Sequence, residues 1–492
     1  MKKHEKILIA VLVASTVGCA SVSKNNEQQA AGVNDVYKSG NVAAATSQLN
    51  STFNTAKLDP KKDKIDTTYY LEKGTFQANA VPAKLPQSTA NLLVADMVVS
   101  DWENRAALSL RMSPAEFANA MADDFKQTAY YQPRDYEKSF VNYMIATNHV
   151  LAERYDLALP GAQRIREREE VIRNTREKLY EATREELVST TKSAQGVGTK
   201  ITSADQIPGY DASFMKEPEV AHLRNSYSNA ASYYLAGFIF EREKESSLAE
   251  TSYKRVSQLV PNAPIMKATP KDGRGTFSKN TSEVLIIVDT GFLPDVYSFK
   301  AVIPFWTPSG PKAVTWVVPS IKNNGIYFKP NYIGVDSNQV PLSMVANVDA
   351  MAKRELKDQM PTYITRAIVS SIIQIAAQEA ASQLIDKKAG GNPLLKLVTS
   401  AAVNALAAGD VDTRMWKSLP ANVYMARVRL PKGEHTLALP GVQNSPIKIN
   451  INDPYEVVHA RVFANGKVAL NASQKQLGDE EYNVRMQAEL KE

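Results

Sequence analysis

The chain has 492 residues, a formal net charge of +6 and a single cysteine, and 44% of its residues are hydrophobic. This hydrophobic content can fill ordinary cores, which excludes a disordered chain, and the length allows two to four domains. Basic residues do not gather in one block, so the charge does not indicate a nucleic-acid partner. Cys19 has no second cysteine to pair with, which excludes an internal disulfide.

The first eighteen residues are typical of a targeting signal, because three lysines precede the apolar run from Ile7 to Val17. This run is too short to span a bilayer. The residues Thr16 to Cys19 resemble a bacterial lipobox, which implies cleavage before Cys19 and lipidation of that residue. Ala20, where an aspartate would signal retention in the inner membrane, implies lipid anchoring in the outer membrane, facing the periplasm. The alternative is ordinary secretion with cleavage after Ala20.

From residue 33 to 261 apolar residues recur at helical spacing. Large, small and aromatic residues followed by a proline resemble a tetratricopeptide repeat, a helix pair that must stack on neighbours to bury its apolar face. The predicted packing positions are Tyr143, Ala146, Tyr155, Ala158, Tyr233, Gly237, Phe240, Ala249, Tyr253 and Pro261. The alternative is a generic helical bundle.

Residues 163–189 mix acidic and basic side chains with a thin apolar stripe at Ile165, Ile172 and Leu179. This pattern predicts a long, solvated helix with ion pairs between neighbouring turns. A coiled coil that binds a partner is the alternative.

After residue 282 the pattern changes to short apolar runs that predict strands. These runs cover 284–288, 297–305, 313–318, 325–328, 423–430, 436–439, 447–451 and 457–463. Asn465-Gly466 predicts a hairpin after the last run. Helices are expected at 350–356, 364–385 and 393–408, and we expect the second to pack in a core and not to cross a membrane.

These patterns predict an α+β fold, in which an N-terminal tetratricopeptide-like helical domain precedes a β-rich, sandwich-like domain with inserted helices. The expected segments are a lipoprotein signal peptide at 1–18, a lipidated tether at 19–32, the helical domain at 33–261, a linker at 262–282, the β-rich domain at 283–473 with a helical insertion at 347–408, and a polar C-terminal tail at 474–492.

A short motif lies between the predicted insertion and the next strand. Its residues are Asp412, Arg414, Trp416 and Pro420, and Arg427 and Gly433-Glu434-His435 follow it. Together they resemble a family of bacterial outer-membrane lipoproteins that pair tetratricopeptide-like repeats with a C-terminal β domain. The resemblance implies an association with lipoproteins that activate peptidoglycan synthases. From the residues themselves we expect Asp412 and Arg414 to pair, and Trp416 to hold the insertion to the sheet; a ligand site is the alternative.

The sequence contains no HExxH, GxSxG or P-loop motif and no cysteine pair. We therefore expect no enzymatic activity, no metal and no cofactor. The favoured function is a lipid-anchored periplasmic scaffold that binds other cell-envelope proteins through its helical repeats. The alternative is an enzyme or carbohydrate-binding module that acts on peptidoglycan or surface polysaccharide, because carboxylate pairs leave no local signature.

Overall fold

The computed structural model describes residues 32–53, 66–113, 116–117, 131–193, 196–322, 327–389, 411–443, 445–473 and 478–489. The predicted signal peptide, Cys19 and the predicted helix at 393–408 lie outside these residues.

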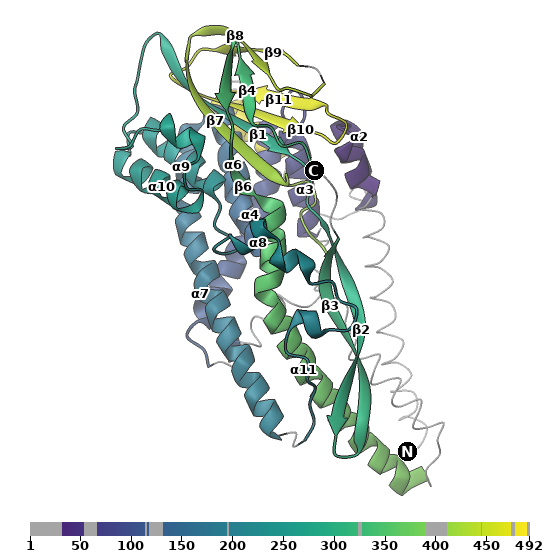
Figure 1. The fold of residues 1–492 in the computed structure, drawn as a ribbon. Coiled ribbons are helices and arrows are strands. Elements are labelled where there is room, and N and C mark those ends of the chain that lie inside the picture. The colour runs from purple at the N-terminus through teal and green to yellow at the C-terminus, as the bar shows by residue number, and fades with distance from the viewer. Residues whose placement is uncertain are drawn as a thin grey trace.

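Three antiparallel helix pairs form the helical part (Figure 1). They are α3 (Thr67–Ala78) with α4 (Leu85–Ser109), α6 (Asp135–Leu151) with α7 (Tyr155–Ser193), and α9 (Ala230–Arg242) with α10 (Ser246–Leu259). Each pair contacts the next pair along the chain. The first helices of the pairs, α3, α6 and α9, are buried over most of their length, whereas α10 buries only one face.

A five-stranded sheet covers the inner side of these helices, in the order β11-β10-β1-β7-β6. Its strands are β1 (Thr281–Thr290), β6 (Ser343–Asn347), β7 (Asn422–Pro431), β10 (Tyr455–Val462) and β11 (Val468–Ala472). β1 and β10 are parallel and the other neighbours are antiparallel. Leu285 and Ile287 of β1 pack against the helices, while Val284 and Ile286 face the other way. Both faces of this sheet are buried, which explains the unbroken apolar run in β1.

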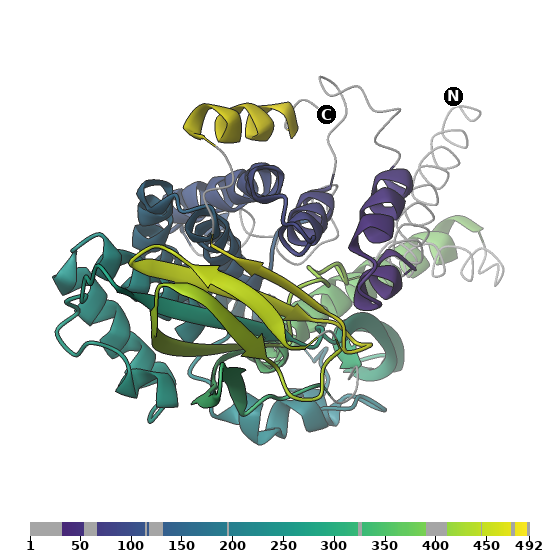
Figure 2. The same ribbon diagram turned by 90° about the horizontal axis from the view of Figure 1, so that it is seen from above.

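A second sheet packs on the outer face of the first one, so that helices and two sheets form three layers (Figure 2). Its strand order is β5-β4-β8-β9, from Asn338–Pro341, Tyr332–Val335, Gly433–Ala438 and Ile447–Ile451. Ile333, Leu437 and Ile451 of this sheet share a core with Ile286 of the first one. The two sheets thus pack face to face, as in a sandwich.

A long arm leaves this body (Figure 1). It consists of α11 (Val348–Ala389) and a two-stranded ribbon of β2 (Asp295–Thr307) and β3 (Gly310–Lys322). Phe305 and Trp316 of the ribbon pack with Ile364 and Ile372 of α11. The indole Nε1 of Trp316 donates a hydrogen bond to Ser371 Oγ at 2.9 Å. Within the described residues, no helix has the length and apolar character needed to cross a membrane.

Smaller elements complete the chain. They are a helix through residues 32–38, α2 (Val42–Thr52), α8 (Pro218–Ala221), α13 (Asp479–Glu489) and short 3₁₀ helices at Ala204–Gln206, Ser213–Lys216 and Pro264–Lys267. Of these, α13 packs on α4, and the hydroxyl of Tyr482 lies 3.1 Å from Thr89 Oγ1.

Several predicted boundaries are wrong. The expected helices at 350–356 and 364–385 are one helix, α11, which contains Pro361. Residues 327–328 of the expected strand 325–328 are not in a strand. In the helical half, the helix expected from residue 163 begins earlier, because α7 runs from Tyr155 through Pro160.

The expected linker and tail are parts of the folded body. In the segment 262–282, Ile265 is buried, and a Cβ added to Gly275 would overlap the Tyr455 hydroxyl. In the C-terminal segment, Glu489 forms an ion pair with Lys73 at 2.7 Å. Because the helices and the first sheet also share one hydrophobic cluster, the two halves of the chain form one body and not two independent domains.

Candidate functional site

The junction motif lies between the helices and strand β7. Arg414 Nη2 lies 2.6 Å from Asp412 Oδ2, and Arg414 also pairs with Asp66, the N-cap of α3. Arg134 donates hydrogen bonds from Nη2 to the backbone carbonyls of Asp412 and Arg414, at 3.1 and 3.2 Å. The predicted pair of Asp412 and Arg414 is therefore present in the structure, and it includes a third partner from the helical half.

Trp416 is fully buried within this motif. Its indole Nε1 donates to Thr75 Oγ1 of α3 at 2.8 Å, and its backbone N–H donates to Glu137 Oε1 of α6 at 2.8 Å. Pro420, further along the motif, is also buried. The expectation that this motif holds the helical insertion to the sheet is wrong, because Trp416 attaches the entry of β7 to α3 and α6.

Glu137 is the centre of the contacts around Trp416. Its carboxylate accepts hydrogen bonds from the hydroxyls of Tyr131 and Tyr136, at 2.5 and 3.1 Å, and from the backbone N–H of Arg134 at 2.9 Å. With Trp416, four donors converge on one carboxylate. Burial raises the pKa of Glu137, an effect that Arg134 opposes. Glu137 is the third residue of α6, a position from which a glutamate often binds the N-cap N–H.

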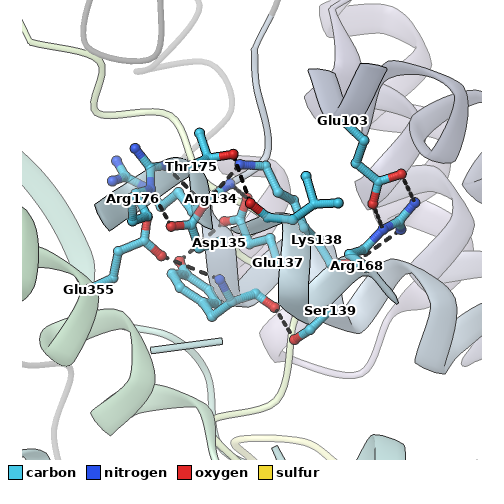
Figure 3. A network of polar contacts seen from close by, with 12 residues as sticks. Glu103, Arg134, Asp135, Glu137, Lys138, Ser139, Arg168, Thr175, Arg176 and Glu355 are labelled. Atoms are coloured by element: carbon cyan, nitrogen blue, oxygen red, sulfur yellow. Dashed lines mark hydrogen bonds and ion pairs between the residues drawn. The ribbon is translucent and has the colours of Figure 1, made fainter. Parts of the chain in front are cut away.

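Asp135, two residues before Glu137, forms a second buried cluster (Figure 3). Its carboxylate binds Arg176 of α7 at 2.5 and 2.9 Å and Lys138 at 2.8 Å. Burial by itself would raise the pKa of Asp135, but Arg176 and Lys138 outweigh it and hold the pKa well below its usual range. The Lys138 ammonium also lies 3.4 Å from the centre of the Trp102 ring.

The predicted solvated helix is in fact tied to α4 along one side. Arg168 of α7 has a 2% exposed side chain and lies 2.8 Å from Asp96 Oδ1 and 2.5 Å from Glu103 Oε1. Ile172 and Leu179 are buried on the same side. The mixed charges of this helix therefore include buried ion pairs, and its exposed residues such as Tyr180 and Val188 lie elsewhere on its surface.

A small pocket opens beside these clusters, where α6, α7 and α11 meet the junction motif. Its lining includes Arg134, Lys138, Arg176, Glu355, Gln359, Tyr363 and Asp412. Burial raises the pKa of Glu355, and so does the charge of Asp135. The pocket measures about 30 Å³, room for roughly two water molecules, whereas small-molecule sites typically measure about 300–1,000 Å³. This pocket is too small for a sugar or a peptide.

A second buried ionic network attaches α9 and α10 to the first sheet. Arg427 of β7 lies 2.6 Å from Glu241 of α9 and 2.8 Å from Glu283 of β1, and the three side chains are at most 5% exposed. The hydroxyls of Tyr253 and Tyr455 both donate to Glu241, each at 2.7 Å. The sequence pointed to Arg427 and Tyr253 separately, but it gave no sign that Glu241 joins them.

The predicted repeat positions lie mainly at helix contacts. An added Cβ at Gly237 would lie 2.5 Å from the Tyr253 ring, which shows how closely α9 and α10 approach. Buried in the same hydrophobic cluster are Tyr143, Ala146, Tyr155, Ala158, Tyr233, Phe240, Ala249 and Tyr253. Pro261 is exposed in the turn after α10.

The histidines and the buried glutamate that could act as acids or bases each contact a different structural partner. His435 Nδ1 lies 2.7 Å from Asp336, and His459 Nε2 lies 2.9 Å from Asp289, on strands of different sheets. Burial raises the pKa of Glu72 to about 7, although its carboxylate accepts the backbone N–H of Lys417 at 2.7 Å. Across the part of the chain that the structure describes, no three His, Cys, Asp or Glu residues are grouped to hold a metal ion.

Comparisons with known proteins give little further information. No family model matches the sequence, and no curated protein is similar to it in sequence. A search of solved structures finds the crystal structure of a tetratricopeptide repeat protein from Parabacteroides merdae ATCC 43184. That match has 14% identity and a TM-score of 0.14, and it covers 51% of this chain and 99% of the other. Similarity at this level is too low to indicate a common fold.

Proposed function

We propose that this chain is a lipid-anchored adaptor of the cell envelope, attached to the outer membrane through Cys19 and facing the periplasm. It binds other envelope proteins and catalyses no reaction. The observation that supports this proposal is that the two sides of the helix pairs differ in their exposure to solvent. The inner helices α3, α6 and α9 are buried, with the chain's own sheet against them, while the outer helices keep exposed surface.

Because of this arrangement, we place the partner-binding surface on the outer side of the helices and not on the inner side. Helical-repeat scaffolds use extended concave surfaces for binding. Here Trp416, Arg427 and Tyr455 occupy the inner side of the helices, so the chain itself fills the side on which such scaffolds bind their partners. The outer surface of α7 is the proposed contact, because Tyr180 and Val188 remain 50% and 47% exposed there between charged residues.

Photocrosslinking in intact cells tests the adaptor function. A benzoylphenylalanine at Tyr180 is expected to capture an envelope protein, whereas the same residue at Phe277, which is 47% exposed on the body, is the control for exposure alone. Capture from neither position, or equal capture from both, would contradict the proposed surface.

Fractionation tests the anchor. We expect Cys19→Ser to release the protein from outer membranes washed at high salt, which screens charge-dependent lipid contacts, while the neighbouring substitution Ser23→Ala leaves it bound. Retention of the Cys19→Ser protein would show that Cys19 does not carry the anchor.

The alternative function, an enzyme on peptidoglycan or surface polysaccharide, has one observation in its favour: Glu72, Glu137 and Glu355 have raised pKa values, as acid catalysts often do. Their surroundings argue against it. Glu137 is bound by four donors, and the pocket beside Glu355 has room for roughly two water molecules.

A further inference from the structure

The ribbon of β2 and β3 has two very different faces. Its inner face carries Ile303, Phe305 and Trp316, which pack with α11. Its outer face carries Val302, Pro304 and Trp306, all of them exposed, with Val302 at 62% and Trp306 at 47%. The strand register places Thr315, Ala313 and Pro311 opposite these three residues. An antiparallel ribbon with one solvated face normally carries polar residues there, so this apolar outer face needs another explanation.

The exposed outer face of the ribbon carries positive charge. Lys300 of β2 is exposed on the same face as Val302 and Trp306. The register places Lys312 opposite Phe305 of the inner face, and Asp295 at the base of β2 pairs with Lys417 at 3.1 Å. Lys200 adds a second positive charge beside this face, because its ammonium lies 5.6 Å from the centre of the Trp306 ring. Gly198, two residues earlier, exchanges backbone hydrogen bonds with Trp306 at 2.8 and 3.1 Å, which fixes this segment against β2.

We propose that the outer face of the ribbon lies on an anionic phospholipid surface, with Trp306 at the level of the headgroups. Tryptophan is enriched at membrane interfaces, and lysines near a bilayer surface are attracted to anionic lipids. A second copy of the chain fits this face less well, since a symmetric contact would place the lysines of both copies together.

This inference rests on the proposed lipid anchor, and the reach of the chain agrees with it. Val33 and Phe292 pack in one cluster, so the tether and the ribbon start from the same region of the body. The 14 residues from Cys19 to Gly32 span at most about 47 Å, and the 13 residues of β2 extend about 40 Å. An acylated Cys19 and the tip of the ribbon can therefore reach the same bilayer.

Vesicle flotation of the full chain with Cys19→Ser tests the contact without acyl chains. Vesicles of phosphatidylethanolamine and phosphatidylglycerol are expected to bind this protein, and phosphatidylcholine vesicles are not. Binding should fall with salt and shift the tryptophan emission to the blue. That signal reports Trp306, because the side chains of Trp102, Trp316 and Trp416 are buried.

Variants of exposed residues identify the surface. We expect Lys300→Glu to weaken binding at least about fivefold, and Trp306→Ser to remove the blue shift and weaken binding similarly. Val484→Ser on α13, where the side chain is 56% exposed, is the matched control and should bind like the parent. Circular dichroism confirms that each variant is folded.

Three results would overturn the proposal: no preference for anionic vesicles, equal binding of the Trp306→Ser variant, or capture of an acidic protein from position 302 in cells without vesicle binding. Since all flotation uses the chain without its lipid, loss of the ribbon contact is distinguishable from failure of the Cys19 anchor, which fractionation reports separately.

Discussion

The indole of Trp416 donates its hydrogen bond to the hydroxyl of Thr75, a residue 341 positions earlier in the chain, at 2.8 Å. This contact joins the segment that leads into strand β7 to the helix α3. It is one of several buried polar contacts that connect the helices to the first sheet, and it shows that the two halves fold as one unit.

Trp416→Ala should lower the free energy of unfolding by about 3–5 kcal/mol, because the indole is fully buried. Trp416→Phe removes the hydrogen bond but keeps most of the aromatic ring. We therefore expect a smaller loss of roughly 1–3 kcal/mol, which arises mainly because the buried hydroxyl of Thr75 loses this donor. Urea unfolding of both variants measures these values. A wild-type value for Trp416→Ala, together with lost partner capture, would mean that the motif is a ligand site.

Glu241→Ala should cost about 3–5 kcal/mol, because it leaves Arg427 buried with one fewer partner. The control is Glu434→Ala, which breaks the ion pair with Lys448 at a site where both side chains are more than 60% exposed; its cost should be at most about 1 kcal/mol. Equal losses in the two variants would show that the Arg427 network is not buried as described.

Gly237→Ala should destabilise the protein by roughly 1–3 kcal/mol, since the added Cβ would overlap the Tyr253 ring. Gly478→Ala is the comparison, because an added Cβ there meets no atom within 4 Å. Thermal unfolding of the two variants checks this difference. An unchanged melting temperature for Gly237→Ala would contradict the close contact of α9 and α10.

The buried Glu72 should make stability depend on pH. Burial raises the folded pKa of Glu72 to about 7 from its usual 4.5, because the neutral carboxyl is favoured in the core. The stability that this neutral form contributes is therefore complete below pH 4.5 and is lost as the pH rises through 7. The shift corresponds to roughly 3 kcal/mol. We expect Glu72→Gln to be less sensitive than the wild type between pH 4.5 and 8, whereas the exposed Glu434→Gln keeps the wild-type dependence. Parallel curves for wild type and Glu72→Gln would contradict this prediction.

The sequence predicted the elements whose signals are local. The run from Val284 to Val288 marks β1 because both faces of that strand are buried, and Asn465-Gly466 marks the turn between β10 and β11. The α+β class follows from such runs. The short strands β4, β5 and β6 escaped prediction, because four or five residues carry too little periodicity to identify them.

The buried polar clusters could be predicted only in part. Asp412 and Arg414 are two residues apart, so their pairing was visible in the sequence. Glu241 and Arg427 are 186 residues apart, and Glu137 and Trp416 are 279 apart, so only the folded chain brings them together. For the same reason the sequence could not show that the inner side of the helices is filled.

We infer that the three helix pairs depend on the chain's own sheet for a stable fold. A fragment of residues 33–261, which contains all three pairs, tests it directly by thermal unfolding followed with near-ultraviolet circular dichroism. Because α3, α6 and α9 would expose their buried faces, we predict that the fragment has no fixed aromatic signal and no cooperative transition. A native-like near-ultraviolet spectrum with a sharp transition would show that the helices form an independent repeat domain and would contradict the claim.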